Sequence, residues 1–193
     1  MTTYFRCSLL RVPVDPTLAV TGSDSLLLRD EPERLVDGKF QAFTPRSYID
    51  FALSAGYNRN VATSALRGAV SSQLAAVARA RRLGVELLVG TDAPNPETFF
   101  GSSLHWELER FVEASLSPLE AIRLATKGAA AFLGAPDLGS IESDKLADLI
   151  LLDANPPEDI HNTETIWRVI KGGWLFDPEK LKKPASTVEV SGK

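Results

Sequence analysis

The chain has 193 residues, of which 44% are hydrophobic and 24% charged, values that are ordinary for a globular protein. Its formal net charge is −4 and it has no basic stripe, so nucleic-acid binding has little electrostatic support. Cys7 is the only cysteine, which excludes an internal disulfide and a cysteine-based zinc site. The N-terminus lacks a signal pattern and no apolar run approaches the roughly 20 residues of a membrane span. We therefore expect a cytoplasmic protein without a membrane segment.

The first 55 residues carry weak secondary-structure signals. Residues 9–20 resemble a strand interrupted by two prolines, which cannot donate to a ladder and therefore favour a short or edge strand. Residues 21–43 are polar without a sustained period, and we predict a long loop or a short helix there. Thr44-Pro45 is typical of a helix start, and the helix is predicted to end at about residue 55.

A helix followed by a buried strand forms the clearest α/β unit of the sequence. The helix is predicted over about residues 64–83, and Gly84 suits its C-terminal cap. The strand covers 85–91, where an apolar run between glycines favours a buried, parallel strand. The apolar stripe of the helix has the spacing i, i+4, i+8 and i+11; it consists of Leu66, Val70, Leu74 and Val77.

Asp92 stands where the predicted strand ends, with Pro94 and Asn95 behind it. The carboxyl end of a buried parallel strand lies at the rim of an α/β sheet or barrel, where ligands and catalytic groups collect. An acid at this position is a metal ligand, a general base or a helix cap, and the local sequence leaves all three open.

Helices follow the Asp92 loop, and a β region follows the helices. Ser117, Pro118 and Glu120 predict a capping box at the start of a helix that runs to about residue 127. An earlier helix is predicted over 103–114 and a short one over 129–133.

Beyond residue 136 the pattern changes to short strands, predicted at 139–142, 147–153 and 166–176. We divide the chain into an incomplete barrel segment (1–136), a β-sandwich segment (137–177) and a flexible tail (178–193).

Six motifs come in the order found in one enzyme superfamily. They are Gly90-Thr91-Asp92-Ala93, Ser103-Leu104-His105-Trp106-Glu107, Ser117-Pro118-Leu119-Glu120, Leu138-Gly139-Ser140-Ile141-Glu142, Lys145-Leu146-Ala147-Asp148 and Val169-Ile170-Lys171-Gly172-Gly173. Together they resemble the C-terminal part of the metal-dependent amidohydrolase superfamily, especially its imidazolonepropionase-like members. Residues 14–18, Val-Asp-Pro-Thr-Leu, look like the penultimate barrel strand of that family.

The resemblance implies an α/β fold: a partial (β/α)₈ TIM barrel, with the last two strands and their helices, plus the C-terminal part of a small β-sandwich. It implies a hydrolase that cleaves a non-peptide C–N bond, such as that of a cyclic amide or similar small substrate, with metal-activated water. Asp92 stands at the position that ligates a divalent metal, zinc in the expected complete enzyme, and takes the proton of the attacking water. Asn95 and His105 are expected to border the substrate.

The sequence departs from the family pattern in its ligands and length. It has two histidines, His105 and His161, and no His-x-His motif. A complete barrel takes about 250 residues, more than the chain has. We therefore expect a C-terminal fragment that is inactive alone, does not hold the metal stably, and either associates with itself or lacks an N-terminal part. The competing hypothesis is a non-catalytic α/β remnant that serves as an assembly module.

Structural explanations also exist for several polar residues. His105 can be a packing residue near a helix start, and Asp148 and Asp153 can serve strand-end turns rather than a glycosidase-type carboxylate pair. Because two strands cannot close a barrel, we expect the helix face around Leu66, Val70 and Leu74 to stay partly uncovered.

Overall fold

The structure, a computed structural model, describes residues 12–54 and 61–181. The predicted strand residues 9–11, the predicted helix end at residue 55 and positions 182–193 of the predicted tail lie outside the described residues. In chain order the elements are η1 (Ala19–Ser23), α2 (Asp24–Asp30), η2 (Pro32–Val36), α3 (Gly38–Phe43), α4 (Arg46–Ser54), α5 (Thr63–Arg82), α6 (Ser102–Glu113), α7 (Pro118–Arg123), η3 (Leu124–Gly128), α8 (Ala129–Phe132), β1 (Leu149–Leu152), η4 (Ile160–Glu164), β2 (Ile166–Lys171), β3 (Trp174–Phe176) and α9 (Pro178–Leu181).

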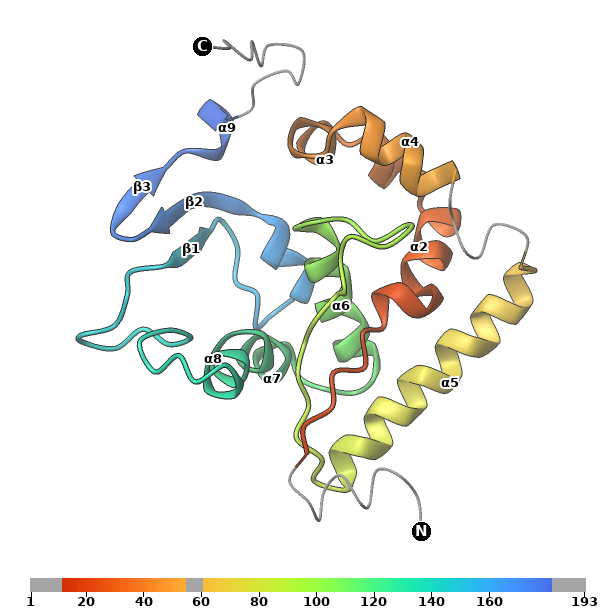
Figure 1. The fold of residues 1–193 in the computed structure, drawn as a ribbon, viewed down its shortest axis with the longest axis horizontal. Coiled ribbons are helices and arrows are strands. Elements are labelled where there is room, and N and C mark those ends of the chain that lie inside the picture. Colours follow the sequence, from red (N-terminus) through yellow and green to blue (C-terminus); the bar gives the residue numbers. More distant parts are fainter. Residues whose placement is uncertain (1–11, 55–60, 182–193) are drawn as a thin grey trace, which may run out of the picture.

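Two extended segments run side by side in front of α6 (Figure 1). Val14 and Leu87 form a parallel bridge, in which Val14 N donates to Glu86 O at 2.9 Å and Leu88 N donates to Val14 O at 2.9 Å. Within the described residues the two segments pair at this bridge, so the described pairing is shorter than the strands predicted from the sequence. Prolines 13 and 16 flank Val14 and have no N–H to donate, which limits the ladder to its neighbourhood.

The main core lies between these segments and the helices α5, α6 and α7. Its central side chains have almost no exposed surface; they are Leu18, Val77, Ala80, Val85, Leu87, Leu108, Phe111, Ala114, Leu116, Ala121 and Ile160. The capping box at the start of α7 is confirmed, because Ser117 accepts a hydrogen bond from Glu120 N and Glu120 reaches back to Ser117 N. The apolar periodicity of α5 and the capping signal of α7 thus located two of the helices that carry the core.

Of the two alternatives for residues 21–43, a long loop or a short helix, the structure shows the helical one, as several short helices rather than a single one. Leu27 and Leu28 of α2 and Phe40 of α3 pack with Phe99 and Trp106 in a second apolar cluster. These helices are short and gain their stability from this packing, which leaves only a weak periodic signal in the sequence.

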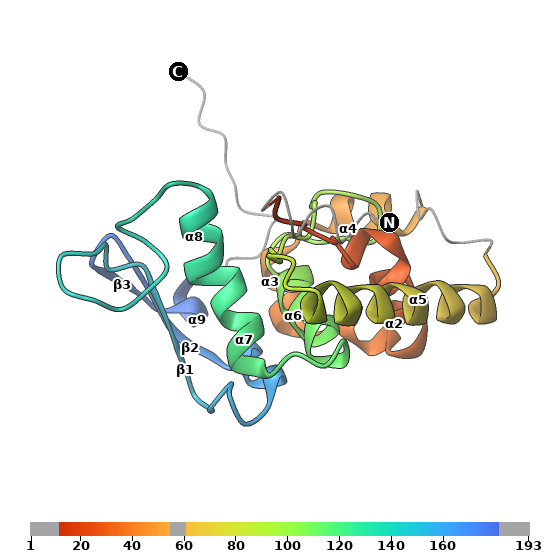
Figure 2. The ribbon, with the colours of Figure 1, turned by 90° about the horizontal axis from the view of Figure 1, so that it is seen from below.

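The prediction of an uncovered α5 face was wrong for two of its three residues, Leu66 and Val70. Leu66 and Val70 are 3% and 5% exposed because Leu26 of α2 packs against them. The short helix α2 therefore covers part of the face that was predicted to be open. Figure 2 shows α2 and α5 together on the same side of the molecule.

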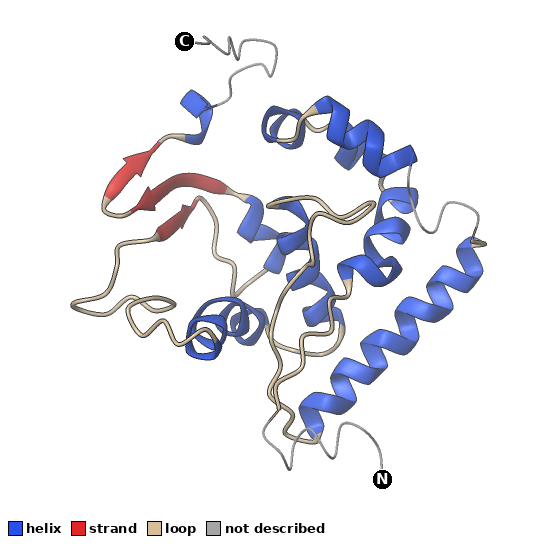
Figure 3. Ribbon diagram, viewed as in Figure 1, coloured by secondary structure: helices blue, strands red, loops and turns tan. Residues whose placement is uncertain are grey.

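The described part of the C-terminal region contains an antiparallel sheet with the strand order β1-β2-β3 (Figure 3). Gly172 and Gly173, both with positive φ, turn β2 into β3. Asp148 accepts a hydrogen bond from Gly172 N at 2.7 Å and pairs with Lys171, which confirms its turn role. The strand predicted over 139–142 is absent from the structure, where these residues form bends and turns.

Gly139 explains why no strand forms at 139–142. Its φ is +83°, and a Cβ at this position would lie 2.7 Å from Thr126 O of η3. The chain therefore makes a tight, close approach to the helical layer here, which a regular strand does not allow. Farther along, residues 178–181 of the predicted tail form α9.

Candidate functional site

Asp92 directly follows the extended segment 85–91. Its backbone is left-handed, with φ of 53°, and its side chain is exposed. Asn95 Nδ2 donates to Asp92 O at 2.5 Å and to Asp92 Oδ2 at 3.0 Å. Thr91 Oγ1 accepts a weak bond from Ala93 N at 3.4 Å, in keeping with a strand-end role. The structure thus brings together two residues that the sequence assigned to the site, Asp92 and Asn95.

A second carboxylate, Asp15, stands at the corresponding end of the neighbouring parallel segment. Asp15 Oδ1 accepts a hydrogen bond from Thr17 N at 3.2 Å, and Gly90 N–H is a further donor to this carboxylate. Burial raises the pKa of Asp15 above its usual value and the charge of Asp92 adds to the rise, while the two N–H donors oppose it.

Sequence reasoning did not select Asp15 for the site. A signal was present, because Asp15-Pro16 follows an apolar residue at a strand end in the manner of Asp92.

His105 lines a cleft that does not include Asp92. It lies on α6, where its Nδ1 is 2.9 Å from Thr163 Oγ1 of η4, and burial lowers its pKa. It lines a cleft of about 890 Å³ whose walls include Trp106 and Phe100 but neither Asp92 nor Asn95. Its contact with Thr163 is the kind of packing role that the sequence left open for it.

Two further carboxyl groups lie in the interior beside the Asp15 turn. Glu107 of α6 has no exposed surface and accepts hydrogen bonds from Leu18 N at 2.9 Å and Ala19 N at 2.7 Å. Asp24 is 1% exposed and accepts from Ser103 Oγ at 2.5 Å. Burial raises the pKa of Glu107 to about 8 and that of Asp24 to about 7. The sequence gave no reason to expect either as a buried group.

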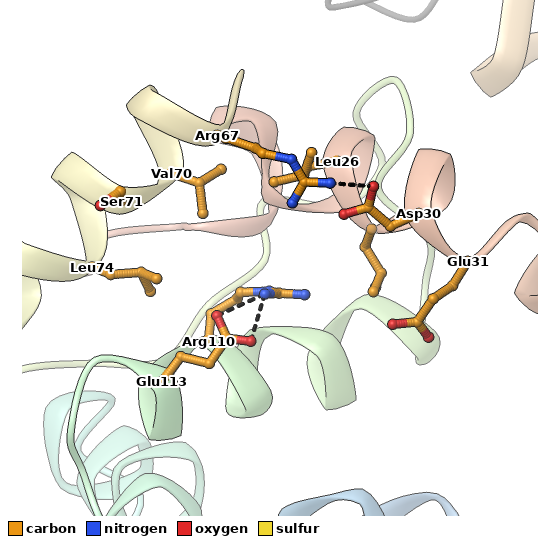
Figure 4. A pocket seen from close by; sticks show the side chains of 10 residues that line it. Leu26, Asp30, Glu31, Arg67, Val70, Ser71, Leu74, Arg110 and Glu113 are labelled. Carbon is orange, nitrogen blue, oxygen red and sulfur yellow. Dashed lines mark hydrogen bonds and ion pairs between the residues drawn. The ribbon is translucent and has the colours of Figure 1, made fainter. Parts of the chain in front are cut away.

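A smaller cavity of about 450 Å³ lies between α2, α5 and α6 (Figure 4). Its two guanidinium groups already have acidic partners: Arg67 pairs with Asp30 at 2.7 Å, and Arg110 pairs with Glu113 at 2.7 Å. Apolar side chains such as Val70 line the rest. With its charges paired internally and Asp92 not among its lining residues, this cavity is not part of the candidate site.

The metal expected from the family resemblance lacks a complete set of ligands within the described residues. Across residues 12–54 and 61–181, no three histidine, cysteine, aspartate or glutamate side chains gather so that they could hold an ion. The exposed Asp92 carboxylate can serve as one oxygen ligand, but a single protein ligand leaves an ion mostly hydrated. The described residues alone therefore do not form a site that fits the expected metal ion. Among the described helices, none has the length and apolar character needed to cross a bilayer.

Comparisons with known proteins place this geometry in a family. Ochratoxinase from Aspergillus niger is 35% identical over 139 residues, which cover 68% of this chain and 28% of that protein. Imidazolonepropionase from Salinispora arenicola is 38% identical over 114 residues, or 57% of this chain and 28% of that protein. A solved Xaa-Pro dipeptidase with bound methionine matches with a TM-score of 0.53 and 32% identity, over 68% of this chain and 33% of its own.

The chain thus spans about a third or less of the length of these relatives. Residues 38–190 match the sequence model of the amidohydrolase family, which is well over half of the chain. The protein belongs to the amidohydrolase family.

Proposed function

We propose that this chain supplies the proton-accepting carboxylate of a hydrolase that cleaves an amide-type C–N bond in a small molecule. The observation that carries the proposal is the placement of Asp92, an exposed carboxylate at the end of a segment with a parallel neighbour, in a member of the amidohydrolase family. The relatives named imidazolonepropionase and Xaa-Pro dipeptidase support small substrates. A cyclic amide is the first substrate class to test, and a dipeptide is the second.

The proposed chemistry assigns one proton path to Asp92. Its carboxylate accepts a proton from the water whose oxygen bonds to the carbonyl carbon, and then passes that proton to the nitrogen as the C–N bond breaks. Asn95 holds the Asp92 carboxylate through Oδ2 and keeps the loop at the border of the substrate. His105, which was also expected at this border, contacts Thr163 of η4. Because the described residues supply no complete metal site, we propose that further ligands come from polypeptide outside them.

The experiment that tests this function has two stages. The transcript upstream of Met1 is sequenced, and the longest product that contains this chain is purified and assayed with a cyclic amide and an Xaa-Pro dipeptide. We expect an upstream His-x-His motif, about stoichiometric metal in the product, and hydrolysis of at least one substrate class. A product that has neither the motif nor any hydrolytic activity contradicts the proposal.

A second candidate function is an assembly module without catalysis. It is favoured by the exposed apolar side chains of the edge strand β3, where Trp174 is 76% and Leu175 is 64% exposed. The same purified product distinguishes the two, because an assembly module binds another chain through β3 and hydrolyses none of the substrates.

A further inference from the structure

Position 90 requires glycine because a side chain there would collide with Asp15, and not because of its backbone conformation. Gly90 is not among the glycines with positive φ, so its backbone is open to other residues. A Cβ at position 90 would lie 2.1 Å from Asp15 Oδ2 and 3.1 Å from Asp15 Cγ, well inside van der Waals contact. Because Gly90 has no side chain, the Asp15 carboxylate occupies the space where a Cβ would lie, and we call this space beside Gly90 the seat of Asp15.

The seat is equipped with donors as well as space. Thr17 N donates to Asp15 Oδ1 at 3.2 Å from one side, and the Gly90 N–H donates from the neighbouring segment. The bridge of Val14 with Glu86 and Leu88 fixes the register that brings the two segments together. Asp15 thus links the end of one parallel segment to the end of the other.

We propose that Asp15 is a positioning residue for Asp92, seated over Gly90 so that it fixes the direction in which the Asp92 carboxylate leaves the segment. This proposal deepens the proposed function and rests on it. Gly90 stands two residues before Asp92, so the Asp15 contact holds the backbone just before the left-handed turn at Asp92. Asn95, in the loop that follows, donates hydrogen bonds to the backbone and the side chain of Asp92. Fixing a reacting group from both sides keeps it in its productive geometry.

Glu107 anchors the Asp15 turn from the opposite side. Both of its oxygens accept backbone N–H groups, at Leu18 and Ala19, three and four residues after Asp15. Glu107 belongs to α6, which begins ten residues after Asp92. The turn that carries Asp15 is therefore tied both to the segment before Asp92 and to the helix after it, which leaves Asp15 little freedom to move away from Gly90.

A first test needs no variant. Amide hydrogen exchange is measured by NMR on the wild-type chain, and the Gly90 amide is compared with its intrinsic rate. Because its N–H donates to a carboxylate, we expect exchange at least about tenfold slower than the intrinsic rate. Exchange of Gly90 at the intrinsic rate overturns the proposal.

The second test is a double-mutant cycle between positions 15 and 90. Gly90→Ala is expected to lower the folding equilibrium constant about tenfold or more in the wild-type background, because the new methyl group meets Asp15. In an Asp15→Ala background the same change is expected to cost less than about threefold, because the clash is gone. If Gly90→Ala lowers the folding equilibrium constant equally in both backgrounds, the close contact between Asp15 and Gly90 is contradicted.

The third measurement reports on Asp92 itself through the Asn95 side-chain amide. Its NMR resonances are expected to shift in Asp15→Asn, because the Asn95 amide donates to Asp92. Amides in the core, such as that of Phe111, are expected to stay in place. Asp50→Asn, which changes an exposed aspartate of α4, is the matched control.

Unchanged Asn95 resonances in a folded Asp15→Asn protein overturn the positioning role. None of these readouts uses substrate or metal, so the failure of the proposed function and the failure of this inference are distinguishable.

Discussion

Glu107 and Asp24 show how a carboxyl group is accommodated in an apolar interior. Loss of hydration penalises the charged form, which is why the pKa of Glu107 rises to about 8 and that of Asp24 to about 7. The N–H groups of Leu18 and Ala19 offset part of this cost at Glu107, as does the Ser103 hydroxyl at Asp24. Both groups therefore bind protons more tightly in the folded chain than in the unfolded chain.

These raised pKa values predict a stability that falls as the pH rises. From about pH 5 the unfolded chain has already released these protons, whereas folded Asp24 retains its proton up to about pH 7 and folded Glu107 up to about pH 8, so the free energy of unfolding decreases as the pH rises toward these values. Each group contributes at most about 1.4 kcal/mol per pH unit. His105, whose pKa is lowered, acts in the opposite direction.

Urea unfolding of Glu107→Gln at pH 5 and pH 8 isolates the contribution of Glu107. We expect a smaller pH dependence in this variant than in the wild type. Glu86→Gln, at an exposed position, serves as the control. An identical pH dependence in Glu107→Gln and the wild type is the result that refutes the assignment.

At single positions, the sequence predicted some residues of the candidate site and gave no signal strong enough to select others, for a physical reason. Asp92 was predicted because a carboxylate after an apolar run is a local signal, and Asn95 was predicted because it lies in the loop that follows. Asp15 meets Gly90 across two segments 75 residues apart in the chain, and a contact of this kind depends on pairing register. Glu107 was visible only as part of a motif, since burial of a carboxylate depends on the partners that the fold brings to it.

At the level of elements, α5 illustrates how packing completes what periodicity begins. Its apolar stripe predicted the helix, but nothing in the stripe named Leu26 as the residue that covers Leu66 and Val70. The covering helix α2 has only seven residues, too few to show a clear period. Strong local signals, such as the Ser117 capping box, were confirmed because they depend on neighbours in sequence.

The covered α5 face predicts a clear cost for truncating its side chains. Leu66→Ala is expected to lower the free energy of unfolding by about 2–4 kcal/mol, because it removes a buried side chain from the contact with α2. Leu83→Ala, at a position that is 36% exposed, is expected to cost much less. Chemical denaturation of both variants makes the comparison. Equal costs for the two variants indicate that α2 does not cover α5 in solution.

For the whole molecule, family membership and the α/β character were predictable from ordered motifs. The extent of pairing between the two parallel segments was not predictable, because prolines 13 and 16 restrict the ladder around Val14. The apolar surface of the sheet is consistent with the expectation of association. Trp174 and Leu175 of β3 are both largely exposed in the chain.

This exposed strand predicts concentration-dependent association. Sedimentation velocity is expected to show larger species as the protein concentration rises, and Leu175→Lys is expected to reduce them. Val36→Lys, which changes an exposed apolar side chain of η2, is the control and is expected to leave association unchanged. A monodisperse monomer at every concentration, with a sharp cooperative melt, contradicts this prediction.

Asp92, the acid at the end of the second parallel segment, is proposed to accept the proton of the attacking water, and one substitution tests this role most directly. In the longest natural product that contains this chain, kcat for the hydrolysed substrate is measured for the wild type, for Asp92→Asn and for the exposed-position control Asp50→Asn. We expect a loss of about 10²–10⁴-fold in Asp92→Asn, the range of general acid–base catalysis, and no loss in Asp50→Asn. A kcat for Asp92→Asn within about twofold of the wild type contradicts it.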